Sequence, residues 1–502
     1  MCLKLALPTS KIFPSEINFF LNMKNKISLV VTIVLIASLF TTPVLAQTTE
    51  DYPEYIVQSG DTLSYISYLF GVSMAEIQQM NNLADPNNIY PDLRLKIPGY
   101  AGIKGLLTPI ILDYGESWEN LLVKYHADEN TLININKLIS PNTLYPGRDL
   151  LIPINESLEV LHPVAIVDEN KTLLENSAII NAESYILLAE NRKNSSLEFF
   201  ANDLIFDSNS NLTPVNAISN EIESISISPL PLSQGDTFTI KVTTKKPITF
   251  SGNLDGKDLK FYTSDDKNYF ALAGIHALAT PGIINLSITG SDGTNELFSN
   301  SQNILLSAGN FGSDPNLVVA PEMIDPAITA PEKEKILSLI SIYTPEKYWD
   351  GIFVSPDTDY ALEIPNYASR KEITSFFGTR RTYNDDPTLT FHTGVDFGGG
   401  VGLPVVSNAA GKVVFAGNLA VRGNAIIIDH GVGVFSGYYH LSSLIVNTGD
   451  MVQKGQQIGK VGNTGRVDRA DEYAGAGAHL HWEIWVNGIQ VDPLEWINSD
   501  YP

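Results

Sequence analysis

The stretch AHLHWEI, residues 478–484, places two histidines one residue apart beside a tryptophan and an acid. On a β-strand successive side chains point to opposite faces, so His479, His481 and Glu483 would share a wet face and the apolar side chains would share the other. A metal site fits this pattern, but so does the polar edge of a half-buried strand, and a short motif is weak support on its own. The rest of the chain has to decide between these interpretations.

The histidines of the chain gather near its C-terminus. Five of the eight follow residue 390, in segments separated along the chain as in a site built from several strands. They are His392, His430, His440, His479 and His481. Zinc in a catalytic site takes three protein ligands and keeps one position for water. The region offers one acid, Asp396, and at least four histidines, so at least two histidines would remain to move protons in a peptide hydrolysis that uses a metal-activated water.

The segment HTGVD, residues 392–396, raises a problem of distance. Four residues of straight strand span about 13 Å, which is too far for His392 and Asp396 to hold one metal. A helix would bring them together, but the residues between them and the glycines that follow oppose a helix. We therefore predict a kinked strand or turn, bent at Gly394, that brings the imidazole and the carboxylate together.

Six segments, in their order along the chain, resemble the lysostaphin-type (LytM-like) zinc metallopeptidases. They are FGTRRTYN (377–384), HTGVDFGGG (392–400), RGNAIIIDHG (422–431), YYHL (438–441), VGNTG (461–465) and HLHWEI (479–484). The resemblance covers roughly residues 370–498. It implies a small, mostly antiparallel β-sheet domain with the site in a groove and Zn²⁺ as the cofactor.

Carried over position by position, the resemblance implies five functional residues. The zinc ligands fall on His392, Asp396 and His481, and the two catalytic histidines fall on His440 and His479. Spacing alone does not distinguish His479 from His481, so that assignment rests on the resemblance.

Three further features of this region stand beside the resemblance. We interpret His430, in the sequence DHG, as structural. We expect Glu483 to orient His481 by bonding it on the side away from the metal. The family usually joins its Gly-Asn-Thr-Gly stretch to His-x-His through a short linker ending in Gly-Pro-His, whereas RVDRADEYAGAGA, residues 466–478, intervenes here. We hypothesise that this longer, charged loop tunes the choice of substrate.

An internal repeat occupies the front of the chain. YIVQSGDTLSYISYLFGVSMAEIQQMNNL (55–83) and IYPDLRLKIP (89–98) have a weaker copy displaced by 55 residues. Each copy is predicted to form strand, helix, helix and strand, over residues 54–98 and 109–153. A helix cap at Asp61 or Thr62 and a capping box of Ser73 with Glu76 support this pattern in the first copy.

The two copies resemble the LysM module, which implies binding of N-acetylglucosamine in peptidoglycan or chitin. The glycan-binding residues implied for the first copy are Asp61, Thr62, Ile89 and Tyr90, between the Gly60–Thr62 turn and the Ile89–Pro91 loop. The second copy departs from the pattern with Glu116, Ser117 and Trp118. The alternative is that the pair is a structural spacer.

The middle of the chain divides by composition. Residues 155–220 show no clean period and stay unassigned, whereas short β-branched runs separated by Gly, Asp, Asn and Pro predict an Ig-like β-sandwich over residues 224–307. Asp-Pro and Ala-Pro pairs mark residues 308–365 as a linker with one helix, Glu332 to Ile342, before the zinc domain at 366–498. His276 has no acidic or histidine neighbours, and we interpret it as a core or hydrogen-bonded histidine. We give His126 and His162 the same interpretation.

The net charge of the chain and its N-terminal sequence indicate which partners and which location to expect. A formal net charge of -24 and a pI near 4.6 argue against a nucleic-acid partner, which needs positive surface. The apolar run 27–40 after a basic start predicts an export signal within residues 1–46, with Met23 as a candidate true start. An uncleaved anchor is the alternative. Cys2 is the only cysteine, so the mature chain would have no thiol. Once the signal is removed, the mature chain would also have no membrane span. We expect it to be secreted or bound to the cell wall.

The sequence thus predicts a multidomain, mostly β protein that acts as an exported peptidoglycan hydrolase. LysM modules would hold the glycan while a zinc endopeptidase domain cleaves peptide cross-bridges or stem peptides. The alternatives are a non-catalytic scaffold of the wall, an activator of another hydrolase, or a glycan binder of the lectin class.

Overall fold

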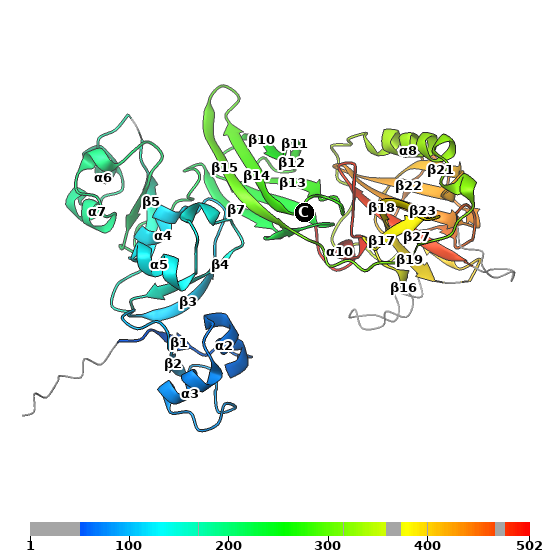
Figure 1. Ribbon diagram of the computed structural model, residues 1–502. Coiled ribbons are helices and arrows are strands. Elements are labelled where there is room, and N and C mark those ends of the chain that lie inside the picture. The colour runs from blue at the N-terminus through cyan, green and yellow to red at the C-terminus, as the bar shows by residue number, and fades with distance from the viewer. Residues whose placement is uncertain (1–50, 169, 315, 358–372, 399, 467–476) are drawn as a thin grey trace, which may run out of the picture.

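A computed structural model describes most of the chain, and Figure 1 shows its domains arranged one after another. The described residues are 51–168, 170–314, 316–357, 373–398, 400–466 and 477–502. The predicted export signal lies outside these ranges, as do residues 467–476 of the 466–478 loop. None of the helices within the ranges combines the length and the apolar character that crossing a bilayer requires. The architecture confirms the mostly β, multidomain class predicted from the sequence.

The first two modules share one four-stranded sheet, ordered β2-β1-β3-β4. Each folds as strand, helix, helix and strand, as predicted. The elements are β1 (Glu54–Ile56), α2 (Leu63–Phe70), α3 (Met74–Asn81), β2 (Arg94–Lys96), β3 (Leu106–Ile111), α4 (Trp118–Lys124), α5 (Glu129–Ile135), η1 (Pro141–Thr143) and β4 (Asp149–Ile154). Thr62 caps α2, and the predicted capping box of Ser73 and Glu76 opens α3. Each helix pair packs on a small apolar core.

The unassigned region also contains regular structure. It forms β5 (His162–Ile166), α6 (Leu173–Ile179), α7 (Ser184–Glu190), η2 (Ser196–Glu198) and β6 (Leu204–Asp207). Strands β5 and β6 pair antiparallel, and Leu161 and Phe206 pack toward Val123 of the second module. His162 fits the core alternative of its interpretation, since its Nε2 is buried without a hydrogen-bond partner among the described residues. His126, by contrast, uses its Nε2 to bond the carbonyl of Glu159 at 3.0 Å.

The next domain is a sandwich of two sheets, ordered β11-β10-β14-β15-β8 and β12-β13-β9-β7. Its strands are β7 (Ile222–Ser228), β8 (Leu232–Ser233), β9 (Thr237–Thr244), β10 (Thr249–Leu254), β11 (Lys257–Leu259), β12 (Phe261–Thr263), β13 (Asn268–Gly274), β14 (Gly282–Ser291) and β15 (Glu296–Ser307). Alternate residues of β9, including Phe238, Ile240 and Val242, are fully buried in its core. His276 accepts a hydrogen bond from the backbone of Leu278, so it is a satisfied histidine.

The linker helix differs from its prediction. After η3 (Pro321–Met323), α8 runs over Pro326–Ile340, six residues earlier than the predicted start. Asp325 caps it, and proline is well tolerated in the first position because that N–H has no partner in a helix. Pro331 lies inside the helix, which is why the sequence pattern placed the start after it.

The C-terminal domain is built on an eight-stranded sheet ordered β16-β19-β27-β23-β22-β21-β25, with β28 paired to β27. Its elements are β16 (Ile373–Ser375), β17 (Arg380–Tyr383), β18 (Asp386–Phe391), β19 (Val395–Gly398), β20 (Pro404–Val406), β21 (Gly411–Leu419), β22 (Gly423–Gly431), β23 (Val434–Leu441), β24 (Ser443–Leu444), β25 (Met451–Val452), β26 (Gln457–Lys460), β27 (His479–Val486), β28 (Ile489–Val491) and α10 (Pro493–Trp496). Two smaller sheets, β17-β18 and β20-β26-β24, complete it.

Both faces of this sheet are covered, which corrects the expectation of a wet face on residues 479–484. Leu480 and Trp482 point into the main core. On the other face, α8 packs through Ile336 and Ile340 on a second cluster that includes Trp485, as its position over the sheet in Figure 1 suggests. The predicted alternation of polar and apolar residues is present, but the polar face is covered and carries a buried site.

Candidate active site

The predicted bend at Gly394 is present. Strand β18 ends at Phe391 and β19 begins at Val395, so the chain turns between His392 and Asp396. A Cβ atom at position 394 would lie 2.2 Å from the carbonyl oxygen of Trp482, and only glycine lets the two strands approach this closely. The turn brings His392 Nε2 to 3.1 Å from Asp396 Oδ1. The kink predicted from the sequence is therefore confirmed.

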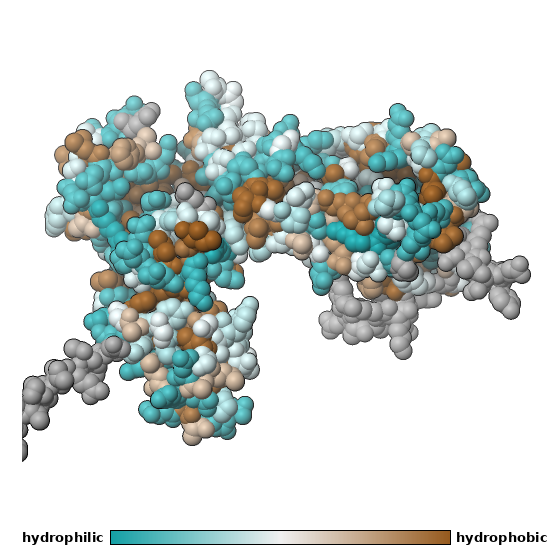
Figure 2. All heavy atoms as spheres, in the orientation of Figure 1, coloured by the Kyte–Doolittle hydropathy of each residue, from teal (hydrophilic) through white to brown (hydrophobic). Residues whose placement is uncertain are grey.

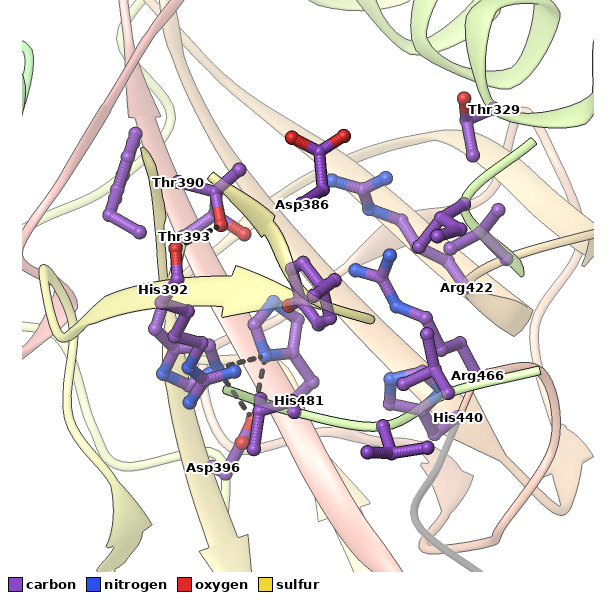
Figure 3. A pocket seen from close by; sticks show the side chains of 18 of the residues that line it. Thr329, Asp386, Thr390, His392, Thr393, Asp396, Arg422, His440, Arg466 and His481 are labelled. Carbon is purple, nitrogen blue, oxygen red and sulfur yellow. Dashed lines mark hydrogen bonds and ion pairs between the residues drawn. The ribbon is translucent and has the colours of Figure 1, made fainter. Parts of the chain in front are cut away.

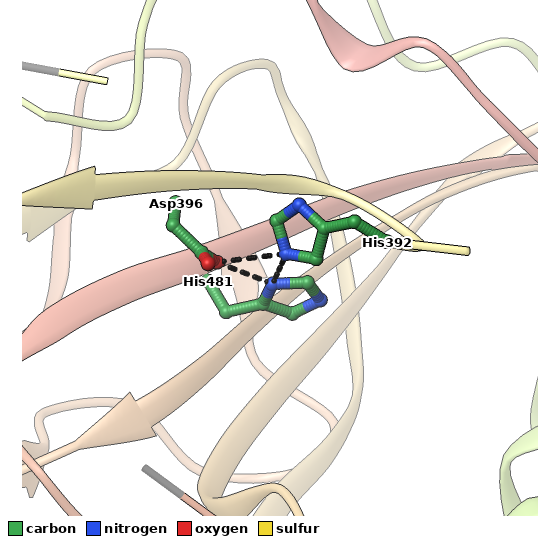
Figure 4. A group of neighbouring side chains, drawn as sticks. All are labelled: His392, Asp396 and His481. Carbon is green, nitrogen blue, oxygen red and sulfur yellow. Dashed lines mark hydrogen bonds and ion pairs between the residues drawn. The ribbon is translucent and has the colours of Figure 1, made fainter. Parts of the chain in front are cut away.

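Three side chains meet at one point between β18, β19 and β27 (Figure 4). Asp396 lies directly opposite His481 in the β19–β27 register. His481 Nδ1 is 2.7 Å from Asp396 Oδ1 and 3.0 Å from His392 Nε2. Zinc bonds of about 2.0–2.2 Å in a tetrahedral site require ligand atoms about 3.3 Å apart, so this set needs only a slight expansion to hold an ion. Within the described residues, these three form a group able to bind a metal.

The other nitrogen of each ligand histidine is held by the protein. His392 Nδ1 lies 3.0 Å from the carbonyl oxygen of Phe376, and His481 Nε2 lies 3.1 Å from Glu483 Oε1. These partners hold the proton on the outer nitrogen and leave His392 Nε2 and His481 Nδ1 free to bind a metal. Glu483 therefore lies where an orienting partner of His481 was expected.

Charge supports the same arrangement. Burial opposes ionisation of Asp396, yet His392 and His481 hold the pKa of its carboxyl well below the usual range. Burial also opposes ionisation of Glu483, but Arg422 and His481 keep the pKa of that carboxyl low. Glu483 accepts from Thr393 Oγ1 at 2.6 Å as well. Both carboxylates are thus negatively charged and ready to offset a cation.

Two further histidines stand beside the ligand cluster. Their rings, those of His440 and His479, lie 4.8 Å apart between centroids. His440 donates from Nδ1 to the carbonyl of Thr464 at 2.7 Å, and His479 donates from Nδ1 to the carbonyl of Gly477 at 2.8 Å. The same choice of nitrogen leaves both Nε2 atoms available, and that of His479 is 3.8 Å from Asp396 Oδ1.

An irregular backbone conformation positions the side chain of His440. It lies in a β-bulge of β23 against β22 and has a left-handed φ of 60°, an uncommon conformation for a histidine. The bulge turns its side chain toward the cluster. Burial, with smaller contributions from His479 and His481, lowers the pKa of His440 to about 3. Its imidazole is neutral at neutral pH and can accept a proton.

The cluster lies at the bottom of a groove with a volume of about 580 Å³. One wall is the linker segment with Leu317, Val318 and Val319, and another is the β17–β18 hairpin. Figure 3 shows Arg422 and Arg466 beside His440 and opposite His392. Neither arginine was predicted as a site residue, because Arg422 stood out only as the first residue of the segment 422–431 and Arg466 only as the first residue of the loop 466–478.

Arg422 connects the linker helix α8 to Glu483, the hydrogen-bond partner of His481. Glu332 of α8 accepts from the backbone N–H of Val421 at 2.7 Å and from the Arg422 guanidinium at 3.4 Å. Arg422 in turn donates to Glu483 at 3.1 Å. A helix from outside the six recognised segments therefore supports the partner of His481.

His430 has the structural role expected of it. It is fully buried, its Nδ1 bonds the carbonyl of Ala410 at 2.8 Å, and its Nε2 bonds Ser436 Oγ at 2.7 Å. Burial lowers the pKa of this imidazole to about 4, so it stays neutral. No nitrogen of His430 is left for a metal.

The four residues expected to bind glycan in the first module differ in their hydrogen bonds, their packing and their exposure. Asp61 accepts from the Tyr55 hydroxyl at 2.8 Å and from the Gln58 backbone at 2.7 Å, and Thr62 caps α2. Ile89 packs against the module core, whereas Tyr90 is 58% exposed. The structure thus brings them to one loop pair but leaves Tyr90 as the main free surface.

The fold and the cluster together define a metallopeptidase domain with two small strand-helix-helix-strand modules in front of it. In agreement, residues 390–493 match Peptidase family M23, and residues 55–98 and 114–153 match the LysM domain. The chain therefore carries a family M23 peptidase domain and two LysM domains, as the resemblance predicted.

Individual relatives are similar over about a quarter of this chain. The peptidoglycan DD-endopeptidase ShyA of Vibrio cholerae is 37% identical over 127 residues, which are 25% of this chain and 28% of that protein. The DD-carboxypeptidase/endopeptidase Mpg of Neisseria meningitidis is 39% identical over 21% of this chain and 23% of its own length. The catalytic domain of lysostaphin from Staphylococcus simulans is 34% identical, with 22% of this chain and 80% of that chain covered and a TM-score of 0.19. The chain thus spans about a quarter of the length of these two curated relatives.

Proposed function

We propose that this chain is an exported peptidoglycan hydrolase whose LysM modules hold the glycan while its C-terminal domain hydrolyses a peptide bond of a cross-bridge or stem peptide. The observation that carries the proposal is the cluster of His392, Asp396 and His481, with the free Nε2 atoms of His440 and His479 facing it. The similarity to peptidoglycan endopeptidases supports the class of substrate.

The residues present fit a zinc ion. Two imidazole nitrogens and one carboxylate oxygen are a donor set that would hold catalytic zinc, and the three residues line the groove that a substrate would enter. When bound, zinc would act as a Lewis acid that polarises the scissile carbonyl and lowers the pKa of a water molecule to about 7.

The protein's own groups supply the proton transfers. A neutral imidazole of His440 or His479 takes a proton from the attacking water at Nε2, and an imidazolium gives a proton to the leaving amine. The carbonyls of Thr464 and Gly477 fix both rings through their Nδ1 atoms, so these transfers need no rearrangement of the rings. No nucleophilic side chain is needed.

We also propose that the loop over residues 466–478 tunes which bond is cut. Arg466 at its beginning lines the groove, and His479 follows its end. Replacing the loop by a short turn should change the pattern of peptide products while zinc content stays the same. Unchanged products would contradict this role.

Digestion of purified peptidoglycan separates the proposed function from its alternatives. The mature chain should release new peptide amines, chelation should lower this rate by about a thousandfold or more, and added zinc should restore it, because the ion contributes several kcal/mol to the transition state. A scaffold, activator or lectin-class protein would release nothing by itself, and a glycosidase would produce new reducing ends instead.

A further inference from the structure

Residues 161–207 repeat the fold of the two LysM domains. The order β5, α6, α7 and β6, with antiparallel pairing of the outer strands, is that of β1, α2, α3, β2 and of β3, α4, α5, β4. The repeat keeps the displacement of 55 residues found between the first two copies. Neither the sequence pattern nor the LysM domain match extends to this region.

A buried asparagine gives the strongest sign of equivalence. Asn191 donates to the carbonyls of Leu187 and Phe206, both at 2.8 Å, and accepts from the backbone of Phe206 at 2.8 Å. Asn81 makes the same three bonds to Ile77 and Lys96, at 2.9, 2.7 and 2.7 Å.

The second module contains the same asparagine bridge. Asn136 bonds Leu132 and Leu151 at 3.0, 2.9 and 2.7 Å. In all three modules the asparagine ties the end of the second helix to the last strand, 15 residues further on.

The backbone repeats in the same register. Three left-handed positions recur at intervals of 55 residues, and most are not glycine, although few non-glycine residues adopt this conformation. They are Gly71, His126 and Asn181; Asn82, Lys137 and Arg192; and Asp92, Gly147 and Asn202. The first-helix caps Thr62, Ser117 and Thr172 follow the same interval. Independent modules would not share so many unusual dihedral angles.

The third copy escaped the sequence analysis because its recognisable residues have changed. Asn170 stands where the first two copies have glycine, and Ala201 stands where they have proline. Asn176 replaces a core residue that is Ile66 in the first copy, and Asp207 replaces Ile97. The asparagine bridge and the left-handed turns remain because they define the backbone path.

The loop pair that could face a ligand is open in the first module and covered in the second. A Cβ atom on Gly60 would meet nothing within 4 Å, whereas one on Gly115 would lie 2.9 Å from Ile218. Gln302 of the sandwich accepts from the Gly115 backbone at 2.8 Å and donates to the Glu116 carbonyl at 2.9 Å. A Cβ atom on Gly147 in the other loop would lie 2.6 Å from Leu230. The second module is therefore a joint to the sandwich.

The third module is open in the same place as the first. Phe200 is 68% exposed at the position that Tyr90, 58% exposed, occupies in the first copy. Figure 2 shows apolar residues on the surface over α6 and α7, so this module has further exposed apolar side chains besides Phe200. The exposed large apolar side chains of this module are Leu174, Ile179, Tyr185, Ile186, Leu197 and Phe200.

We infer that residues 161–207 are a third LysM-type module, and that it binds a polysaccharide strand of the cell wall through the loop that contains Phe200. This inference rests on the proposed function for the ligand class. The chain would then hold its substrate at two open modules, the first and the third, separated by a second module that acts as a joint. Two linked sites raise the apparent affinity well above that of either alone.

Retention on insoluble peptidoglycan tests the inference in the full chain. All variants would contain His440→Ala, so that no bond is cut during the measurement. Phe200→Ala should weaken the apparent affinity about three- to tenfold because one of two linked contacts is lost, and Phe200→Tyr should restore it. Tyr90→Ala should have a similar effect, and the two together a larger one.

Two aromatic residues serve as matched controls. Tyr185 is 69% exposed and lies on the same module, in the first turn of α7 and not in the loop that contains Phe200. Tyr145 occupies the equivalent loop position of the covered second module. Replacement of either by alanine should leave retention unchanged.

The outcomes distinguish the inference from the proposed function. If Tyr90→Ala weakens retention and Phe200→Ala does not, the third module binds no glycan and the inference is overturned while glycan holding stands. If Tyr185→Ala weakens retention as much as Phe200→Ala, binding is not at the loop and the inference fails as well. If neither Tyr90→Ala nor Phe200→Ala has an effect, both the inference and the glycan-holding part of the proposed function are wrong.

Discussion

The two ends of the chain organise their functional residues in opposite ways. In the peptidase domain each histidine of the cluster has its second nitrogen held, by Phe376, Thr464 or Glu483 among others, and both ligand histidines are buried. In the first module, by contrast, Tyr90 lies on a loop and is 58% exposed. Catalysis requires a fixed geometry, whereas weak contacts on loops can gain affinity from repetition. Substitutions should therefore have large effects at the C-terminal end and small effects at the front.

The largest effect among these substitutions is expected at His440. His440→Ala should lower kcat by about 10²- to 10⁴-fold, the usual contribution of a positioned acid–base group, while the chain keeps its zinc. Retention on peptidoglycan should not change. Steady-state rates of amine release and the metal content of the variant are measured. A loss of zinc in this variant would show that His440 holds the metal and would contradict its assignment as an acid–base group.

The partner of His481 should matter less than a direct participant. Glu483 receives hydrogen bonds from five donors. Glu483→Gln places an amide N–H against at least one of them and removes the negative charge that His481 Nε2 faces. We expect zinc affinity to fall about 10- to 100-fold, as for other partners behind a ligand histidine. Competition with a chromogenic chelator measures this. Glu495→Gln is the matched control, since it changes a buried carboxyl elsewhere, and equal affinities of the two variants would contradict the role of Glu483.

The smallest effect concerns the joint between the sandwich and the peptidase domain. There Glu495 accepts from the Thr237 backbone at 2.9 Å, and burial, together with the charge of Asp236, raises its pKa to about 8. Burial also raises the pKa of the neighbouring Asp492 to about 6. A raised carboxyl pKa means that the folded chain keeps a proton that the unfolded chain releases above pH 4.5. Stability should therefore fall as the pH rises from about 4.5 to 8 and then level off.

Glu495→Gln removes this ionisation and keeps an acceptor for Thr237. Relative to the original chain, the variant should gain stability as the pH rises from 5 to 8, which urea unfolding followed by tryptophan fluorescence would measure. The same dependence on pH in both chains would show that Glu495 does not titrate in this range.

The sequence predicted those features that depend on local pattern. The kink followed from the impossible span between His392 and Asp396, and the two front modules followed from matching residues at a constant interval. The third module was missed because its glycine and proline positions hold Asn170 and Ala201, whereas the interactions that define it, such as those of Asn191, are invisible without a backbone.

The surroundings of the site were also beyond the sequence. The alternation in residues 479–484 separates two faces but does not say what covers each, and here α8 covers the polar one. Glu332 reaches Arg422 across 90 positions of sequence, a contact that no periodicity indicates. The difference between His479 and His481 likewise becomes visible only in the register, which places His481 opposite Asp396.

The measurement that tests the central claim most directly is the zinc content of Asp396→Ala, beside His440→Ala and the unchanged chain. Our account predicts about one zinc per molecule in the last two and almost none in Asp396→Ala, because the ligand set loses its carboxylate. Full zinc content in Asp396→Ala would contradict the assignment of the ion to His392, Asp396 and His481.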